Sequence, residues 1–107
     1  GHIRQLVGKQ ATTITSSVAA TTVVTAGGAS VFTDLTSITV TNSSATATLV
    51  TLSDGTASLV YNIPAGGGFT IPFNPPMPAT TANTAWTLTC GTSVASVYCN
   101  VVYIKNL

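Results

Sequence analysis

Apolar and polar residues alternate with a period of two through most of this chain, and this sets the strongest limit on its fold. Such alternation is typical of β-strands that turn one face to a core and the other to solvent. Between residues 36 and 41, for example, Ile38 and Val40 alternate with Ser37 and Thr39. Helical spacing of apolar residues is almost absent, so the sequence predicts an all-β fold.

The same period predicts the inner faces of four further strands. These faces are Ala57, Leu59, Tyr61 and Ile63; Phe69, Ile71 and Phe73; Trp86, Leu88 and Cys90; and Val97, Cys99, Val101 and Tyr103. β-Branched and aromatic residues, which favour strands, are frequent in all four.

Turn-forming residues separate these runs at short intervals, at residues 27–28, 42–44, 53–55, 64–68 and 74–78. Asp54 and Gly55 predict a hairpin between strands near residues 46–52 and 56–63, because both residue types tolerate a positive φ. About eight short strands follow from this spacing. Without helices between them, they favour an antiparallel β-sandwich with jelly-roll-like wiring.

A chain of 107 residues fits a single domain that is long enough to bury a core. Residues 31–107 form the predicted sandwich core. Residues 3–30 alternate less clearly, and we interpret them as an N-terminal arm or edge strands. This segment, which carries Arg4 and Lys9, either closes the sheet or reaches to a neighbouring subunit; a loosely packed first strand is the alternative. Residues 1–2 are interpreted as the remnant of a purification tag, or else as a processed natural start.

Charged side chains are rare, with five in 107 residues and a net charge of +1, set among twenty-one threonines and ten serines. Soluble domains usually carry about 25% charged residues. The weak charge predicts neither a nucleic-acid nor a membrane partner, and no run approaches the ~20 apolar residues of a membrane span. A neutral, hydroxyl-rich surface gives little repulsion between copies, which predicts a homo-oligomer or a larger assembly.

Few residues are available for catalysis or metal binding. Asp34 and Asp54 are the only carboxylate side chains, and the turn accounts for Asp54. The only histidine is His2, so a Ser-His-acid triad is not expected, and a calcium site needs more converging oxygens than one turn supplies. The sequence therefore predicts no catalytic residue, no metal site, no cofactor and no enzymatic activity.

Two segments resemble binding motifs in composition only. The glycines at 66–68 precede a predicted strand rather than a helix, so we interpret them as a flexible connection and not as a phosphate-binding loop. The proline-rich residues 75–78 resemble a polyproline ligand, but they lie between two predicted strands, where prolines commonly end pairing and shape a crossover.

Cys90 and Cys99 flank a predicted final hairpin. If its turn is centred on Val94 and Ala95, the two cysteines lie opposite each other and a disulfide between them is geometrically reasonable. Both positions are also on predicted inner faces, where free cysteine is a common small apolar residue. A zinc site is not expected, because four ligands are needed and two cysteines are present.

Three segments, residues 38–55, 63–69 and 93–98, together with the proline-rich link, resemble small proteins of tailed bacteriophages that coat or decorate the virion, above all β-sandwich head decoration (cement) proteins. The resemblance spans about residues 31–104. It implies a non-enzymatic structural protein that binds across subunits of the major capsid protein lattice and stabilises the capsid, often as a homotrimer. It also implies a location on the virion surface after production in the host cytoplasm.

A different class of function is a glycan- or cell-surface-binding module of a fibre or surface protein, because jelly rolls recur in lectins. Carbohydrate sites favour an exposed aromatic platform. Phe32 and Tyr98 are the aromatic residues that the alternation leaves outside the core, so they are the candidate platforms, and a buried Trp86 would count against this function.

Overall fold

The computed structural model describes residues 6–15, 18–92, 94 and 96–106, and these residues form eight strands and no helix. The strands are β1 (Leu6–Ile14), β2 (Thr21–Val24), β3 (Phe32–Asn42), β4 (Thr48–Ser53), β5 (Ser58–Ile63), β6 (Gly68–Met77), β7 (Trp86–Cys90) and β8 (Val97–Asn106). Because the described residues contain no helix, they contain none long and apolar enough to cross a membrane.

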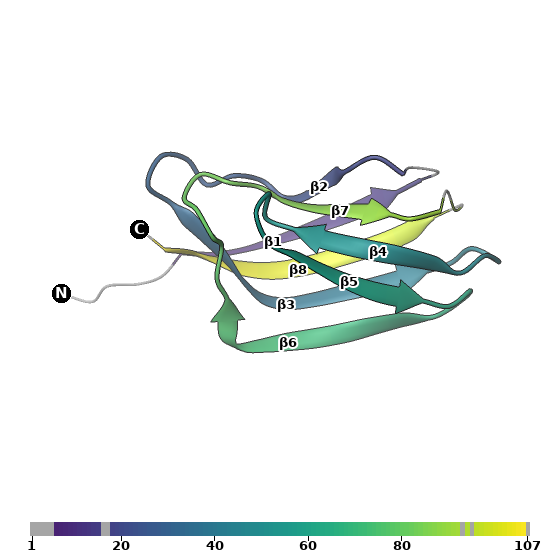
Figure 1. The fold of residues 1–107 in the computed structure, drawn as a ribbon. Coiled ribbons are helices and arrows are strands. Elements are labelled where there is room, and N and C mark those ends of the chain that lie inside the picture. The colour runs from purple at the N-terminus through teal and green to yellow at the C-terminus, as the bar shows by residue number, and fades with distance from the viewer. Residues whose placement is uncertain (1–5, 16–17, 93, 95, 107) are drawn as a thin grey trace.

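The strands form two four-stranded sheets packed face to face (Figure 1). Sheet A has the order β1-β8-β3-β6 and sheet B the order β2-β7-β4-β5, and every pairing is antiparallel. This is the strand order of an eight-stranded jelly roll, in which the chain passes repeatedly from one sheet to the other. The predicted antiparallel β-sandwich with jelly-roll-like wiring is confirmed.

The two longest pairings join β8 to its neighbours in sheet A. β8 pairs with β1 from Leu6 opposite Lys105 to Ile14 opposite Val97, and it pairs on its other side with β3. The first and last strands are therefore hydrogen-bonded along their whole length. β1 and β2, which come from the first thirty residues, each lie at the edge of a sheet.

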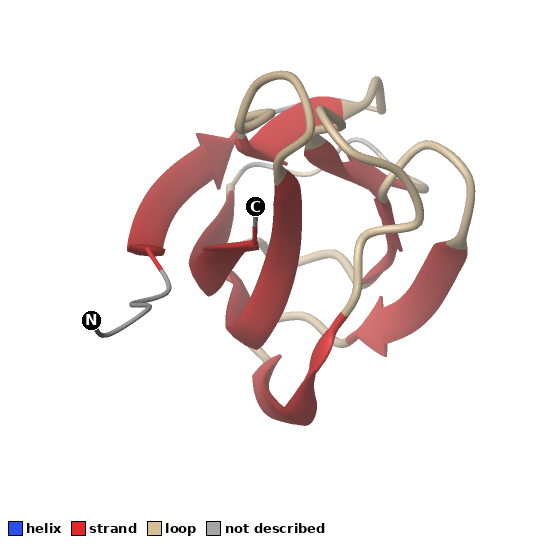
Figure 2. Cartoon of the chain, turned by 90° about the vertical axis from the view of Figure 1, so that its left-hand side faces the viewer, coloured by secondary structure: helices blue, strands red, loops and turns tan. Residues whose placement is uncertain are grey.

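The core lies between the sheets and follows the predicted inner faces. On β7 and β8 every second residue is buried, including Trp86, Leu88, Cys99 and Val101. Figure 2 shows the strands surrounding this core when the sandwich is viewed from one end. The indole Nε1 of Trp86 donates a hydrogen bond of 2.7 Å to the buried carbonyl of Thr33, so the largest aromatic side chain is held inside without an unpaired polar atom.

Three details of the prediction are wrong. β7 and β8 do not form a hairpin, because β7 pairs with β2 and β4 in sheet B whereas β8 belongs to sheet A. The prolines 75–76 do not end a strand, since the edge strand β6 runs to Met77, but its pairing with β3 is interrupted between Pro72 and Met77, as expected at prolines. Ala57 is exposed and precedes β5, because the turn spans residues 54–57.

Candidate functional site

Both carboxylates hold loops in place rather than converging on one site. Asp34 accepts a hydrogen bond of 2.8 Å from the backbone N–H of Ala79 and another from the side-chain amide of Asn106. Asp54 is buried and accepts hydrogen bonds from the backbone N–H groups of Thr56 and Ala57 in its own turn, and of Thr80 in the β6–β7 connection. Asp54 therefore does more than the predicted turn role.

The environment of Asp54 strongly favours its ionised form. Burial opposes ionisation, but hydrogen bonds from Thr80, Ala57 and Thr56 outweigh it and lower the pKa of Asp54 to about 2. A carboxylate this acidic is ionised at neutral pH and is a poor proton donor or base there. Among the described residues no three His, Cys, Asp or Glu side chains come close enough to hold a metal ion.

Two of the three cations, Lys9 and Lys105, lie on strands of sheet A. Lys9 is exposed on the edge strand β1, opposite Val102, and Lys105 is half-buried near the end of β8. Arg4, the other residue of the predicted arm contact, lies outside the described residues. The contact of Arg4 and Lys9 with a neighbouring subunit stays a prediction.

Cys90 and Cys99 lie on facing sheets, and both are buried with free thiols in the structure. Burial raises the pKa of both thiols, that of Cys99 to about 12. Since the thiolate is the reactive form, burial makes both cysteines poor nucleophiles at neutral pH. The hairpin register that suggested a disulfide does not exist, and titration of thiols in the unfolded, unreduced chain tests the bridge directly.

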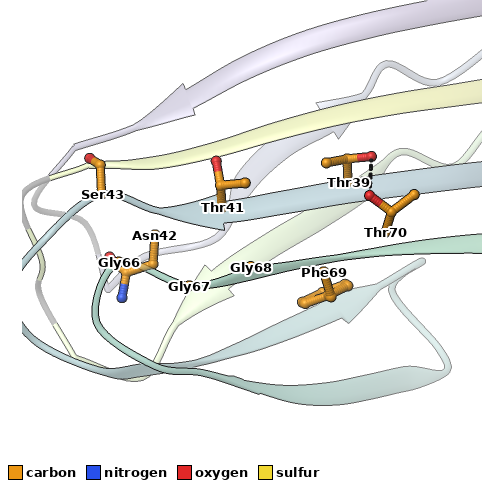
Figure 3. Close-up of a pocket in the computed structure, with 9 residues that line it drawn as sticks. All are labelled: Thr39, Thr41, Asn42, Ser43, Gly66, Gly67, Gly68, Phe69 and Thr70. Atoms are coloured by element: carbon orange, nitrogen blue, oxygen red, sulfur yellow. Dashed lines mark hydrogen bonds between the residues drawn. The ribbon is translucent and has the colours of Figure 1, made fainter.

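The glycines at 66–68 border an open depression of about 560 Å³ between the ends of β3 and β6 (Figure 3). Gly66 has a φ of 68°, which favours glycine, and a Cβ at Gly68 would lie 2.5 Å from the carbonyl oxygen of Val40. The hydroxyls of Thr39 and Thr70 face each other here at 3.0 Å. These glycines thus allow a tight turn between β5 and β6 and a close approach of β6 to β3. They serve as a connection between two strands, as the sequence predicted.

A second depression, of about 400 Å³, lies on the outer face of sheet A. It is lined by Lys9, Gln10, Ala11, Ser37, Thr39, Asn100, Val101 and Val102. Its neighbour on the same face of β8 is Tyr98, and both Tyr98 and Val102 are exposed large side chains. This face offers hydroxyl, amide and apolar groups with Lys9 at its border.

The outer face of sheet B carries no charge, because none of its four strands contains a charged residue. Its most exposed large side chains are Leu49 on β4, at 50%, and Val60 on β5, at 60%. The prediction of a neutral, hydroxyl-rich surface is therefore confirmed for this sheet.

One long side of the sandwich is incompletely covered. Its half-buried apolar side chains come from the neighbouring edge strands β5 and β6, and we call them the β5–β6 seam: Leu59, Tyr61, Phe69, Ile71, Phe73 and Met77. Tyr61 and Phe69 close the gap between the sheets, with ring centroids 4.7 Å apart. On the opposite side, Ile14 of β1 and Val23 and Val24 of β2 are almost fully buried.

The sequence interpretation placed five of the six seam residues on inner faces, and Met77 in the proline-rich turn, but it missed their exposure. Alternation identifies the face of a strand, and it does not tell which strands lie at an edge. One signal was available: Pro72 in the middle of a predicted strand marks an edge position, because proline cannot donate to a neighbour.

No protein-family model and no curated protein matches the sequence. Among solved structures, a chain of the capsid asymmetric unit of cyanophage Pam1 has 16% identity and a TM-score of 0.53, covering 97% of this chain and 89% of that chain. A chain of the virus-like particle of the extra small virus of the giant freshwater prawn Macrobrachium rosenbergii has 12% identity and a TM-score of 0.47, covering 100% and 82%. The first likeness shows that this chain shares its fold with a chain of a phage capsid.

Proposed function

We propose that the protein is a non-enzymatic structural protein of a phage virion, which binds on the capsid surface across subunits of the major capsid protein and stabilises the shell. It would be produced in the host cytoplasm and lie on the virion surface. The observation that carries this proposal is the outer surface of the sandwich, where exposed apolar side chains stand among hydroxyl groups with very little charge.

The outer face of sheet A is the capsid-binding face that we favour. Tyr98 and Val102 are exposed at 43% and 37%, and Val102 lines a depression that can accept a protruding side chain of a partner. Covering such side chains removes apolar surface from water, at roughly 25 cal/mol per Å². Lys9 borders this face, where an N-terminal arm would add a contact.

Two further observations support a structural role. The two carboxylates and two cysteines are occupied in turns and in the core, which leaves them no common cleft. The chain also shares its fold with a chain of the cyanophage Pam1 capsid.

The test is sedimentation of the protein with expanded capsids of the virus whose genome carries this sequence. Val102→Asp should reduce the bound fraction about tenfold or more, because it places a charge in an apolar contact. Leu49→Asp, at an exposed position on the outer face of sheet B, is the matched control and should bind as the wild type does.

The bound fraction should fall only slightly between low and high salt, because screening acts on Lys9 while the other residues that line the depression are neutral. Failure of the wild-type protein to bind capsids at any ionic strength would overturn the proposal. Equal loss in both variants would overturn the choice of face.

Two observations count against a glycan-binding module. Trp86 is only 2% exposed, so it cannot serve as a platform for a sugar. Phe32 and Tyr98 are exposed, but Phe32 pairs with Asn106 at one end of β8 and Tyr98 lies near the other. Eight residues of strand separate them, roughly 26 Å, so they do not form one platform.

A further inference from the structure

The four edges of the two sheets are unequally protected against pairing with another strand. β6 contains Pro72, Pro75 and Pro76, which cannot donate hydrogen bonds, and β2 is four residues long with a register shift. β1 carries Lys9. Prolines, short length, irregularity and lysine are the usual means of blocking an edge, and β5 has none of them.

The direction of the free backbone groups on β5 follows from the bonds of β4. The carbonyl of Leu49 accepts a hydrogen bond of 2.7 Å from Gly91, so residue 49 bonds toward β7. In a central antiparallel strand, the backbone N–H and C=O groups of successive residues point alternately to the two neighbouring strands. The backbone groups of Val50 and Leu52 therefore bond to β5, where these residues lie opposite Tyr61 and Leu59.

The residues of β5 that alternate with Leu59 and Tyr61 point their backbone N–H and C=O groups away from β4. These residues are Ser58, Val60 and Asn62, and all three side chains are exposed on the outer face. The side chains between them, Leu59 and Tyr61, belong to the β5–β6 seam and are half-exposed. The edge strand β5 thus has both outward-pointing backbone hydrogen-bonding groups and partly exposed apolar side chains.

We propose that β5 pairs antiparallel with β5 of a second copy of this chain. The two-fold axis passes beside Val60, which lies opposite Val60 of the second copy, while Ser58 lies opposite Asn62. Sheet B then continues into sheet B of the second copy, and the two β5–β6 seams are brought together. This is an isologous contact, in which the same patch is used on both subunits.

The register favours a second copy over an unrelated strand because it is self-complementary. Three outward residues on each strand form three hydrogen-bonded pairs, about six N–H···O=C bonds in all. A Val–Val pair is a favourable cross-strand contact, and the edge has no charge to repel its own copy. On the inner side, Leu59 faces Tyr61 of the second copy, which covers two seam residues on each subunit.

This contact does not depend on the capsid role, and it differs from the trimer that the resemblance implies. A two-fold strand pair joins two copies and leaves no equivalent edge for a third. The expected mass is therefore twice, not three times, the 10.8 kDa of the chain.

The test is multi-angle light scattering of the purified protein over a wide concentration range. The wild type should approach the mass of two chains at high concentration, and Val60→Lys should weaken self-association by roughly tenfold or more, because two lysines meet at the axis. Leu49→Lys adds the same charge to the outer face one strand further in and should associate as the wild type does.

Residue-resolved hydrogen exchange of the wild type gives a second readout that needs no variant. The amides of Val60 and Asn62 should gain protection as the protein concentration rises. A wild type that stays monomeric at every concentration, forms a trimer, or associates without protecting these amides overturns the pairing, and so does a Val60→Lys variant with wild-type mass. Capsid sedimentation in parallel keeps the two proposals separate, since a monomer that binds capsids would overturn only the strand pairing.

Discussion

At the scale of single residues, Asp54 shows how a chain with few charges uses one of them. Its carboxylate receives the N–H groups of Thr56 and Ala57 in the β4–β5 turn and of Thr80, which is 26 residues further along the chain. One buried side chain therefore fixes a hairpin and the β6–β7 connection together. Each of these bonds involves an ionised acceptor, which makes it stronger than a neutral one.

Asp54→Asn should destabilise the protein by about 1–3 kcal/mol at neutral pH, because charged hydrogen bonds are lost in a buried place. The pKa of Asp54 is lowered from 3.8 to about 2 on folding, so its stabilising effect is present above pH 4 and is lost as the pH falls toward 2. Urea unfolding across this pH range measures both effects.

The Asp54→Asn variant should lack this part of the acid destabilisation. Asp34→Asn is the control, since it removes the other carboxylate and leaves Asp54 in place. The same slope of stability against pH in the wild type and in Asp54→Asn would contradict the assignment.

At the scale of the strands, alternation predicted which residues face the core but not which strands pair. Ile38 and Val40, Trp86 and Leu88 are buried as expected, because burial of one face is a local property of the sequence. The partner of β8 is not local. Val97 lies opposite both Ile14 and Asn42, and nothing in the residues near 97 specifies that contact.

Because alternation does not predict which strands pair, the sequence also failed to predict the exposed β5–β6 seam and the β5 edge. Neighbouring strands in sequence often form hairpins, so β7 and β8 were expected to pair, yet each crosses to a different sheet of the jelly roll. The exposed seam and the free edge of β5 are consequences of that wiring. They become visible only when the order of strands in both sheets is known.

The β4–β5 hairpin gives a prediction at this scale. Gly55 has a φ of 95°, and a Cβ there would have only an ordinary contact, 3.6 Å from Cγ2 of Thr84. Gly55→Ala should therefore cost about 1–2 kcal/mol through backbone strain alone.

Thermal or urea unfolding measures this cost. Gly55→Asn is the matched variant and should be less destabilised, because asparagine tolerates a positive φ better than alanine does. Equal loss in the two variants would mean that the turn changes its conformation.

At the scale of the whole molecule, charge is distributed unevenly between the sheets. The strands of sheet A contain Lys9, Asp34 and Lys105, whereas the strands of sheet B contain no charged residue. Sheet B and its β5 edge are thus suited to contacts without ions, and such contacts are insensitive to salt.

A single core between the sheets predicts cooperative unfolding. Trp86 lies in the core and is bonded to Thr33 of the other sheet, so its fluorescence should report separation of the sheets. Far-ultraviolet circular dichroism reports the strands themselves. The two signals should change at the same urea concentration, as expected for one domain. Two separate transitions would contradict the single-domain prediction.

The pairing of Leu6 with Lys105 places the two ends of the described chain at the same pole of the molecule. Met77 of the β5–β6 seam lies toward the same pole, because it pairs with Leu35, which also faces Tyr103 of β8. A covalent link engineered between Leu6 and Lys105 would therefore need to span only the distance between adjacent strands.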